Sequence, residues 1–441
     1  MRKILIFSSC EYSLKNKGDQ AMLEGLVGWL KEVDPHSEIT AYEMMPGALS
    51  PIKGVRPFPS PESFMLGISG KHHGSKFKTF IARIRIIFRG IVFIARFFLY
   101  KLIGTRLQKE SYLHGFFHQI LSADALVFSG GGYINGLWWL DGLYSKTFPA
   151  LAARLAARLA GVSVILTSQG LGPFKHPLDR FVAWLLFSSC TVIGVRDGKY
   201  SKSTVNSIAS KSTGRVINTG DDALLVSAAS KLETASIFRT EGIPDTATEL
   251  IVVNLRDSSS YQAGYAKPPF AIAAVVLDEL LEHPGRYVVF VPISYHSEDG
   301  DRESASKIMK SMRHYDRARI ISGEYSPSII KGIIGQAHIA IGTSYHFMLF
   351  ALSQNIPVLA LYQDAYYKQK LEGLCAMYGQ KQYCISLDGM DTKSLSKATQ
   401  ILLDQRHIIF DGLMEKNRAL FADFTAAHIV IRDVILNHRR L

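Results

Sequence analysis

Short apolar runs alternate with amphipathic stretches along the first half of the chain. Residues 3–9 form a compact apolar run, and apolar positions with helical spacing follow at residues 20–33. The next apolar runs, read as strands, lie at residues 38–44, 123–132, 163–172 and 191–197. Between them, residues 148–161 are an Ala- and Leu-rich helix that ends at Gly161, a residue suited to a helix C-cap. Short buried strands separated by helices predict a parallel sheet with helices on its faces.

The same alternation starts again after about residue 245. Strands are expected at residues 249–257, 286–294, 338–342 and 357–363, with helices at 271–283, 347–355 and 392–441. Two sets of this kind predict an α/β protein with two Rossmann-like domains and a ligand site in the cleft between them, at the carboxyl ends of the strands. We place the first domain at 1–235 and the second at 236–395, and expect 396–441 to be helices that pack back on the body.

Residues 71–109 interrupt the first domain with a strongly apolar stretch that contains many basic residues. Lys78, Arg85, Arg89 and Arg96 are spaced so that they share one side of a helix. A transmembrane span is disfavoured, because each Arg near the bilayer centre costs about 2.5–3.5 kcal/mol. Three alternatives remain: a helix lying on an anionic membrane, a helix packed on the domain with its basic stripe in water, or an interface with a partner.

Charge and cysteine content exclude several other classes of protein. The net charge is +12, but residues 71–109 hold ten Lys or Arg and no acidic residue, and no nucleic-acid-binding motif accompanies them. The cysteines, Cys10, Cys190, Cys375 and Cys384, form no CxxC pair and no zinc-site spacing, so reduced structural thiols are expected. The initial apolar run is too short for a secretory signal, which favours a cytoplasmic protein, peripheral on the inner face of the membrane if 71–109 binds there.

Several polar or glycine-rich segments stand where strands end. Asn16, Gly18 and Asp19 open the first long helix, whose free N–H groups favour an anion. The same residues also suit a simple helix cap. Gly130, Gly131 and Gly132 follow a strand and allow the backbone to approach a ligand, although their spacing does not support a dinucleotide site.

Other candidates lie further along the chain. Gln169 ends a strand, and Arg196, at the end of another, could hold a carboxylate or phosphate or simply pair with Asp197. The adjacent Asp221 and Asp222 do not by themselves make a metal site, so no metal is expected.

The richest segment carries His346 in a loop between a strand and an apolar helix. Ser344 and Tyr345 precede it, and Lys368 follows the next strand. A histidine in such a loop can move a proton near neutral pH, although a lone histidine is more often structural.

In order and spacing, these segments resemble the polysaccharide pyruvyl transferase family across almost the whole chain. The matching residues are Asn16, Gly18, Asp19, Gly130, Gly131, Gly132, Arg196, Asp197, Asp222, His346, Phe350, Ala351, Pro357, Tyr362 and Lys368. The resemblance implies a fold similar to the GT-B glycosyltransferase architecture. It also implies transfer of pyruvate from phosphoenolpyruvate to two hydroxyls of a glycan or lipid-linked saccharide. The donor is then a substrate, and no cofactor is implied.

The sequence departs from the family at one position. Where the family has an arginine two residues before the histidine, this chain has Ser344. Either Arg196, Arg256 or Lys368 supplies the missing charge, or the donor differs, or the activity is lost. Three functions therefore remain: a pyruvyl transferase, a glycosyltransferase that uses a nucleotide sugar, and a non-catalytic member of a surface-polysaccharide assembly.

Overall fold

The computed structural model describes the chain except residues 11–12, 67–75, 104–111, 137–146, 189, 210–213, 257–269, 297–299 and 438–441. Two compact units are present. The first domain comprises Met1–Leu14, Met22–Leu225 and Asp423–Leu441, and the second comprises Lys15–Ala21 and Val226–Ala422. The division falls ten residues before the boundary expected from the sequence, and the last helix, Arg406–Asn437, is divided between the two units.

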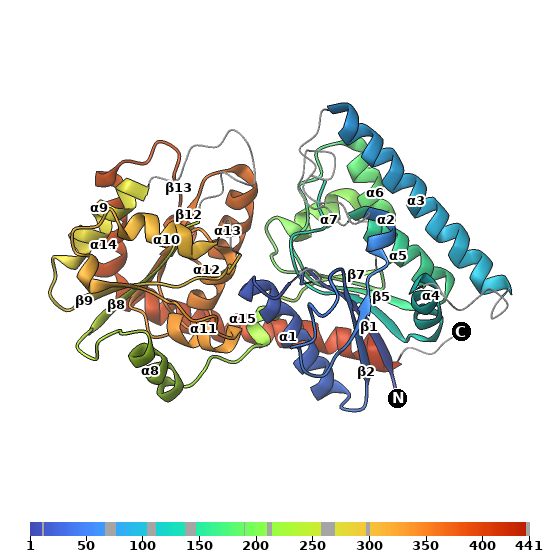
Figure 1. Cartoon of the computed structure of the whole chain (residues 1–441), viewed down its shortest axis with the longest axis horizontal. Coiled ribbons are helices and arrows are strands. Elements are labelled where there is room, and N and C mark those ends of the chain that lie inside the picture. Colours follow the sequence, from blue (N-terminus) through green and yellow to red (C-terminus); the bar gives the residue numbers. More distant parts are fainter. Residues whose placement is uncertain are drawn as a thin grey trace. The chain divides into compact units, whose positions relative to one another are not determined.

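The first domain is built on a seven-stranded parallel sheet of order β3-β2-β1-β4-β5-β6-β7 (Figure 1). The strands are β1 Lys3–Phe7, β2 Glu38–Glu43, β3 Arg56–Pro59, β4 Ala125–Phe128, β5 Ser163–Gln169, β6 Val192–Val195 and β7 Arg215–Asn218. Strand β3 was not foreseen because its sequence is Arg-Pro-Phe-Pro. Proline removes ladder donors, so this strand is tolerated at the edge of the sheet, where it lies.

Helices cover both faces of this sheet. They are α1 Lys17–Val33, α2 Glu62–Leu66, α3 Lys76–Ile103, α4 Tyr112–Ser122, α5 Thr147–Leu159, α6 Pro177–Phe187 and α7 Ser201–Ala209, with a short 3₁₀ turn at Asp222–Leu225. One buried apolar cluster joins the sheet to α3, α4, α5, α6 and α7. A second cluster, on the other face, joins it to α1 and the end of α15.

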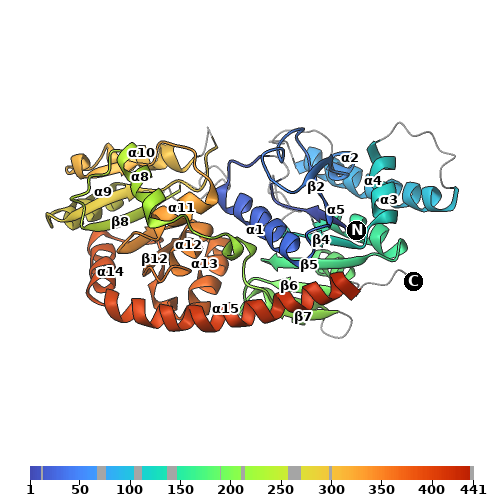
Figure 2. The same ribbon diagram turned by 90° about the horizontal axis from the view of Figure 1, so that it is seen from below.

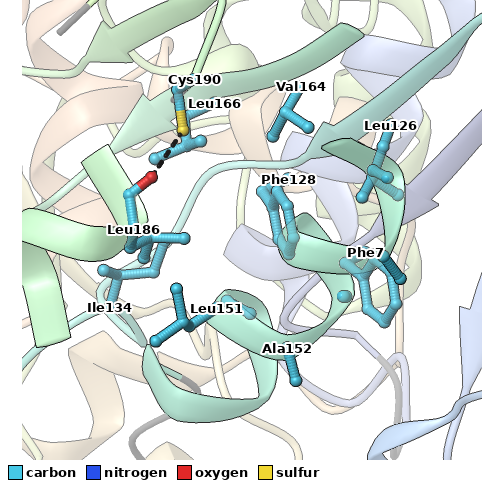
Figure 3. Close-up of a cluster of buried hydrophobic side chains, with 14 of the residues drawn as sticks. Phe7, Leu126, Phe128, Ile134, Leu151, Ala152, Val164, Leu166, Leu186 and Cys190 are labelled. Atoms are coloured by element: carbon cyan, nitrogen blue, oxygen red, sulfur yellow. Dashed lines mark hydrogen bonds between the residues drawn. The ribbon is translucent and has the colours of Figure 1, made fainter. Parts of the chain in front are cut away.

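The larger cluster shows why the Ala-rich helix α5 fits at the centre of its layer. Phe7, Phe128 and Leu166 from the strands meet Leu151 and Ala152 of α5 (Figure 3). Small alanines let this helix approach the sheet closely, while the aromatic rings fill the remaining space. Cys190 is buried at the edge of the cluster as a free thiol, and burial raises its pKa to about 12, which keeps it unreactive.

The second domain has a six-stranded parallel sheet of order β10-β9-β8-β11-β12-β13. Its strands are β8 Glu249–Asn254, β9 Arg286–Phe290, β10 Ala318–Ile320, β11 Ile339–Gly342, β12 Val358–Tyr362 and β13 Cys384–Ser386. Its helices are α8 Lys231–Thr240, α9 Phe270–Leu281, α10 Asp301–Met309, α11 Pro327–Ile334, α12 Tyr345–Leu352, α13 Ala365–Met377, α14 Thr392–Asp404 and α15 Arg406–Asn437, with 3₁₀ turns at Tyr315–Arg317 and Lys381–Tyr383. Numbered within the domain, the strand order is 3-2-1-4-5-6, the Rossmann order.

Helix α15 is the long C-terminal element seen in red in Figure 2. Its residues up to Ala422 belong to the second domain, and those from Asp423 belong to the first. The helical character of residues 392–441 is confirmed up to Asn437. Residues 71–75 and 104–109 of the basic apolar segment lie outside the described residues, whereas Lys76–Ile103 between them is the predicted helix, α3. Of the helices within the described residues, none has the length and apolarity needed to cross a membrane.

Candidate functional site

The candidate site of the second domain lies where its strand order reverses, between β8 and β11. Connections leave these two neighbouring strands in opposite directions, so their carboxyl ends open a crevice in which ligands bind in sheets of this kind. Asn254 ends β8 and Gly342 ends β11. The two loop starts are tied together: Thr343 donates its backbone N–H to Asn254 O at 2.8 Å, and Arg256 donates its own to Thr343 Oγ1 at 3.0 Å.

His346 stands in the first turn of α12, directly beyond β11. It is 9% exposed and packs against Gly18, at the start of α1. A Cβ on residue 18 would lie 2.0 Å from His346 Nδ1, so glycine is required there. The glycine of the N-terminal loop and the late histidine, 328 positions apart in the sequence, are therefore one site. Tyr345, also buried, places its ring edge against the imidazole, with 5.2 Å between ring centroids.

The loop that carries Gly18 is held to the second domain by its backbone. Lys17 N donates to Ile293 O, and Tyr295 N donates to Lys15 O, both at 2.8 Å. Asn16 Oδ1 accepts from the backbone N–H groups of Gly18 and Asp19, at 3.1 and 3.3 Å. Asn16 therefore acts as the N-cap of α1, and the first turn of that helix lies beside the histidine.

Arg256 is fixed by a buried carboxylate. Its Nε donates to Asp301 Oδ1 at 2.7 Å. Asp301 Oδ2 accepts from Asn254 Nδ2 at 2.9 Å and from the N–H groups of Ile293 and Ser294, each at 2.8 Å. Burial acts to raise the pKa of Asp301, but the charge of Arg256 and these hydrogen bonds outweigh it and hold the pKa below its usual value. The carboxylate thus orients Arg256 and ties the strand end to the segment that holds Lys17.

Lys17 is a buried cation in the same region. Its Nζ donates to Glu324 Oε1 at 2.8 Å and to Gln20 Oε1 at 3.1 Å. Lys368 is different, because it is exposed on α13, one strand further along, with its Nζ 5.9 Å from the centre of the Tyr362 ring.

The first domain also has its strand reversal, between β1 and β4, and the glycine triplet stands there. Ser129 N donates to Phe7 O at 2.7 Å, and Gly131 follows with a φ of +143°, a backbone conformation that favours glycine. Gln169 is fully buried and donates to the carbonyls of Phe128 and Ser129, at 3.0 and 2.8 Å. Its side chain holds the strand end in place and does not face solvent.

Arg196 is nearly buried, with its guanidinium over Gly170. A Cβ on Gly170 would lie 2.4 Å from Arg196 Cζ, so glycine is needed for this packing. Asp197, its neighbour, accepts from the N–H groups of Tyr200 and Ser201 at 2.6 and 3.1 Å and caps α7. The two residues thus have separate roles. The position of Asp197 is explained by its bonds to the start of α7, without the ion pair with Arg196 that the sequence suggested.

Asp222 has no exposed surface in the first domain. Its Oδ2 accepts from Thr167 Oγ1 at 2.7 Å, and its Oδ1 lies 3.5 Å from His428 Nε2 on α15. The other ring nitrogen of His428 lies 2.8 Å from Phe424 O. This geometry gives Asp222 a structural task, anchoring α15, in place of the substrate contact that the sequence suggested.

Comparison with known proteins was decisive for the family. A model of the polysaccharide pyruvyl transferase family matches residues 16–364, from the cap of α1 to the cap of α13. The chain belongs to the polysaccharide pyruvyl transferase family. It is accordingly a transferase, and the resemblance seen in the sequence is confirmed.

The solved structures most relevant to this family member share its fold at low sequence identity. A putative UDP-N-acetylglucosamine 2-epimerase from Listeria monocytogenes has a TM-score of 0.59 and 15% identity, over 100% of this chain and 98% of that one. Sucrose-phosphate synthase from Thermosynechococcus elongatus has a TM-score of 0.57 and 12% identity, over 99% and 100%. A glycosyltransferase from Rickettsia africae has a TM-score of 0.56 and 10% identity, over 99% of each chain. These likenesses confirm a GT-B-like α/β fold with two Rossmann-like domains.

For a polysaccharide pyruvyl transferase, the important departure is at Ser344. Ser344 is the N-cap residue of α12 and makes no side-chain capping bond. Among the cations named as substitutes for the family arginine, Arg256 has its backbone N–H bonded to Thr343, three residues before His346, and its guanidinium bonded to Asp301. Sequence reasoning missed Lys17 and Asp301. A lysine beside a cap is ordinarily exposed, and the partner of Asp301 lies 45 residues away with no local pattern to reveal it.

Proposed function

We propose that this chain transfers the pyruvyl carbons of phosphoenolpyruvate to two hydroxyls of a glycan, forming a cyclic ketal. The observation that supports this most strongly is the packing of His346 against Gly18 at the N-terminus of α1, with Arg256 anchored at the adjacent strand end. Gly18 and His346 both lie within residues 16–364, the segment that the family model matches. The proposal therefore combines a proton-handling group, His346, with a cation that favours an anion, Arg256.

The reaction releases one phosphate and consumes no net proton. Protonation of the donor methylene gives a methyl group and a cation-like centre at C2, which the first sugar hydroxyl attacks. The second hydroxyl then displaces phosphate. Of the two protons that the hydroxyls lose, one replaces the proton added to the methylene carbon and the other leaves with the phosphate. In our proposal, His346 moves the proton, while the guanidinium of Arg256, oriented by Asp301, holds an anionic group of the donor. Nothing in this scheme requires a metal or an organic cofactor.

The direct test is phosphate release from phosphoenolpyruvate in the presence of a panel of short glycans. We expect release that depends on the glycan and falls by about 10²–10⁴-fold in His346→Ala, the usual contribution of a general acid or base. His338→Ala is the control, since His338 precedes β11 at the opposite end of that strand. Wild-type turnover equal to that of His346→Ala on every glycan would refute the role of this histidine.

A glycosyltransferase that uses a nucleotide sugar is the second candidate, and Ser344 is the observation that favours it. Without the family arginine, the donor can differ. Ligand-induced stabilisation separates the two: a ligand at about 100 times its Kd adds about 2.7 kcal/mol to the free energy of unfolding. Stabilisation by phosphoenolpyruvate supports pyruvyl transfer, and stabilisation by UDP alone supports glycosyl transfer.

We also propose that the glycan acceptor is lipid-linked, so that the enzyme works beside a membrane. The support for this is the basic apolar helix α3, whose composition is unlike that of the remaining helices. Comparing turnover on a free glycan and on the same glycan joined to a polyprenyl phosphate carrier tests it. Equal kcat/KM for both in the presence of anionic vesicles would argue against a lipid-linked acceptor.

A further inference from the structure

Helix α3 exposes an apolar stripe on the side away from the domain core. Phe93 and Phe97 are completely buried in the larger core cluster, and Gly90 packs on Phe148 of α5. The exposed stripe runs along the other side and consists of Ile84, Phe88, Ile91, Phe98 and Leu102, which are 50% to 65% exposed. Ala95 is exposed between them, so the stripe repeats at intervals of four and three residues, the spacing of one helix face.

A second patch lies on the same face of the sheet. Helix α6 packs on α5 in the layer that also contains α3, as Figure 1 shows. It exposes Leu178, Phe181 and Trp184, and the last two stack with 6.0 Å between ring centroids. Apolar surface on this scale is uncommon unless something covers it. Tryptophan and phenylalanine with exposed rings are also residues favoured at a membrane interface.

The charge of this helix layer has one sign. In helices α2 to α7 as the structure defines them, the acidic residues are Glu62 and Asp179, only 1% and 3% exposed. Exposed basic side chains of the same helices are Arg85, Arg96, Lys101, Arg158, Arg180 and Lys202. The opposite face differs, because α1 and the end of α15 expose Glu32, Asp423 and Asp433. The exposed charges of helices α2 to α7 are therefore all positive, whereas the opposite face carries both signs, Arg432 among them.

We infer that this helix layer, chiefly through the exposed side of α3, docks on an anionic phospholipid surface. The apolar stripe would enter the boundary between headgroups and acyl chains, and the flanking arginines would meet the headgroup phosphates. A second copy of the chain is a poorer occupant, because a symmetric pairing would set this positive face against itself. The inference deepens the proposal of a membrane-borne acceptor by naming the surface that brings the enzyme to it.

The test is co-sedimentation of the full chain with vesicles. One set contains phosphatidylcholine alone, and the other contains equal parts of phosphatidylcholine and phosphatidylglycerol. We expect binding to the anionic set that weakens as salt is added, because exposed charges are screened. Equal binding to both sets, or binding to neither, overturns the inference.

Two variants separate the apolar and the charged contributions. Replacing Arg85, Arg89 and Arg96 by Gln should weaken binding to anionic vesicles on the order of a hundredfold, from the usual contribution of each basic residue near such a surface. The variant Ile84→Ser, Phe88→Ser, Ile91→Ser should weaken binding at least about tenfold. Binding unchanged in either variant contradicts the docking face.

Matched controls lie on the second domain. Leu232→Ser with Ile408→Ser removes two large exposed apolar side chains, and Arg239→Gln with Lys416→Gln and Arg418→Gln removes three exposed charges. Both controls should bind vesicles like the wild type. Light scattering without vesicles measures the oligomeric state. If the wild type is a dimer that the Ser variant dissociates, and neither binds vesicles, the partner of this face is a second copy of the chain and not a membrane.

Turnover on a free glycan is measured in parallel and separates this inference from the proposed function. The α3 variants carry no residue of the candidate site, so their turnover in the absence of vesicles should match the wild type. Lost vesicle binding with normal turnover supports the docking face. If the wild type binds vesicles as expected but neither it nor any variant shows turnover, the docking face is supported and the proposed reaction is refuted.

Discussion

Gly18 allows the start of α1 to pack directly against His346, because it has no side chain. The imidazole of His346 occupies the space that a Cβ would need, so the residue controls where the ring lies. We predict that Gly18→Ala moves the histidine and lowers kcat for phosphate release by about 10²-fold or more, because a displacement of about 1 Å has that effect on a positioned group.

Gly28 offers a control on the same helix. A Cβ at residue 28 meets nothing within 4 Å, so Gly28→Ala should leave turnover unchanged and stabilise α1 by about 0.5–1 kcal/mol. Measuring kcat and the urea midpoint of both variants tests the idea. A loss of turnover in both, or in neither, would show that the close packing at residue 18 does not matter for the reaction.

Asp301 supports the site from below the surface. We predict that Asp301→Ala destabilises the second domain by about 3–5 kcal/mol, because it leaves Arg256 and two backbone N–H groups without their buried acceptor. Urea unfolding measures this. Glu303→Ala, on the same helix, breaks an exposed pair with Lys307 and should cost no more than about 0.5 kcal/mol. Comparable losses in the two variants would mean that the network is not a support.

His428 makes the anchoring of α15 dependent on pH. Burial acts to lower the pKa of His428, but the Asp222 carboxylate and Phe424 O outweigh it and raise the pKa above its usual value of 6.5. A raised folded pKa gives a stabilisation that is complete below the unfolded pKa and lost as pH rises through the folded one.

We therefore predict that the wild type loses stability as pH rises above about 6.5, from the unfolded pKa upward. His428→Gln removes the titrating group and should flatten this part of the profile. Thermal unfolding followed across the neutral range measures both proteins. Parallel profiles for wild type and variant would exclude His428 as the cause.

At the scale of elements, α3 owes its position to Gly90. A Cβ there would lie 2.3 Å from Phe148 Cε1 on α5, so Gly90→Val should destabilise the first domain by about 1–3 kcal/mol through overpacking. Ala95→Val, on the exposed side of the same helix, should change stability by no more than about 0.5 kcal/mol. Urea midpoints decide between them, and equal effects would place α3 away from α5.

The long periodic elements were predictable, and the short ones were not. Strands such as β5 and β8 are buried on both faces, so their apolar runs stand out in the sequence. Strands β10 and β13 have three residues each at the sheet edges, where half-buried positions leave no clear pattern. Helix α8 was not among the helices expected from the sequence, although Ser230 and Glu233 form a capping box that marks its start.

The site was predictable to the extent that its residues follow the ends of strands, although His346 lies in the first turn of α12 and not in the loop expected before it. Gly18 and His346 were chosen on that ground, and Arg256 as a substitute for the family arginine. The structure brings their segments together. Gln169 was chosen as a strand-end residue and Asp222 as a family match, but both are buried supports. A polar residue that supports the fold and one that binds a ligand show no difference in sequence pattern. Side-chain partners far apart in the chain decide between the two roles.

At the scale of the whole molecule, the two sheets share one topological feature, a single reversal of strand order. Each reverses its strand order once, at β1 and β4 in the first domain and at β8 and β11 in the second. The glycine triplet follows β4 at the first reversal, and helix α12 begins directly beyond β11 at the second. This shared architecture explains why the family match and the GT-B-like likenesses agree although sequence identity is low.

The membership of residues 15–21 in the second domain has a practical consequence for dissecting the enzyme. Their backbone is hydrogen-bonded to residues 293–295, and Gly18 is the neighbour of His346. A fragment beginning near residue 226 would carry the histidine but lack its companion loop. A chimera between relatives, or a split version of the enzyme, should therefore take residues 15–21 and the half that begins near residue 226 from the same parent. If the two parts come from different parents, the packing of Gly18 against His346 is lost.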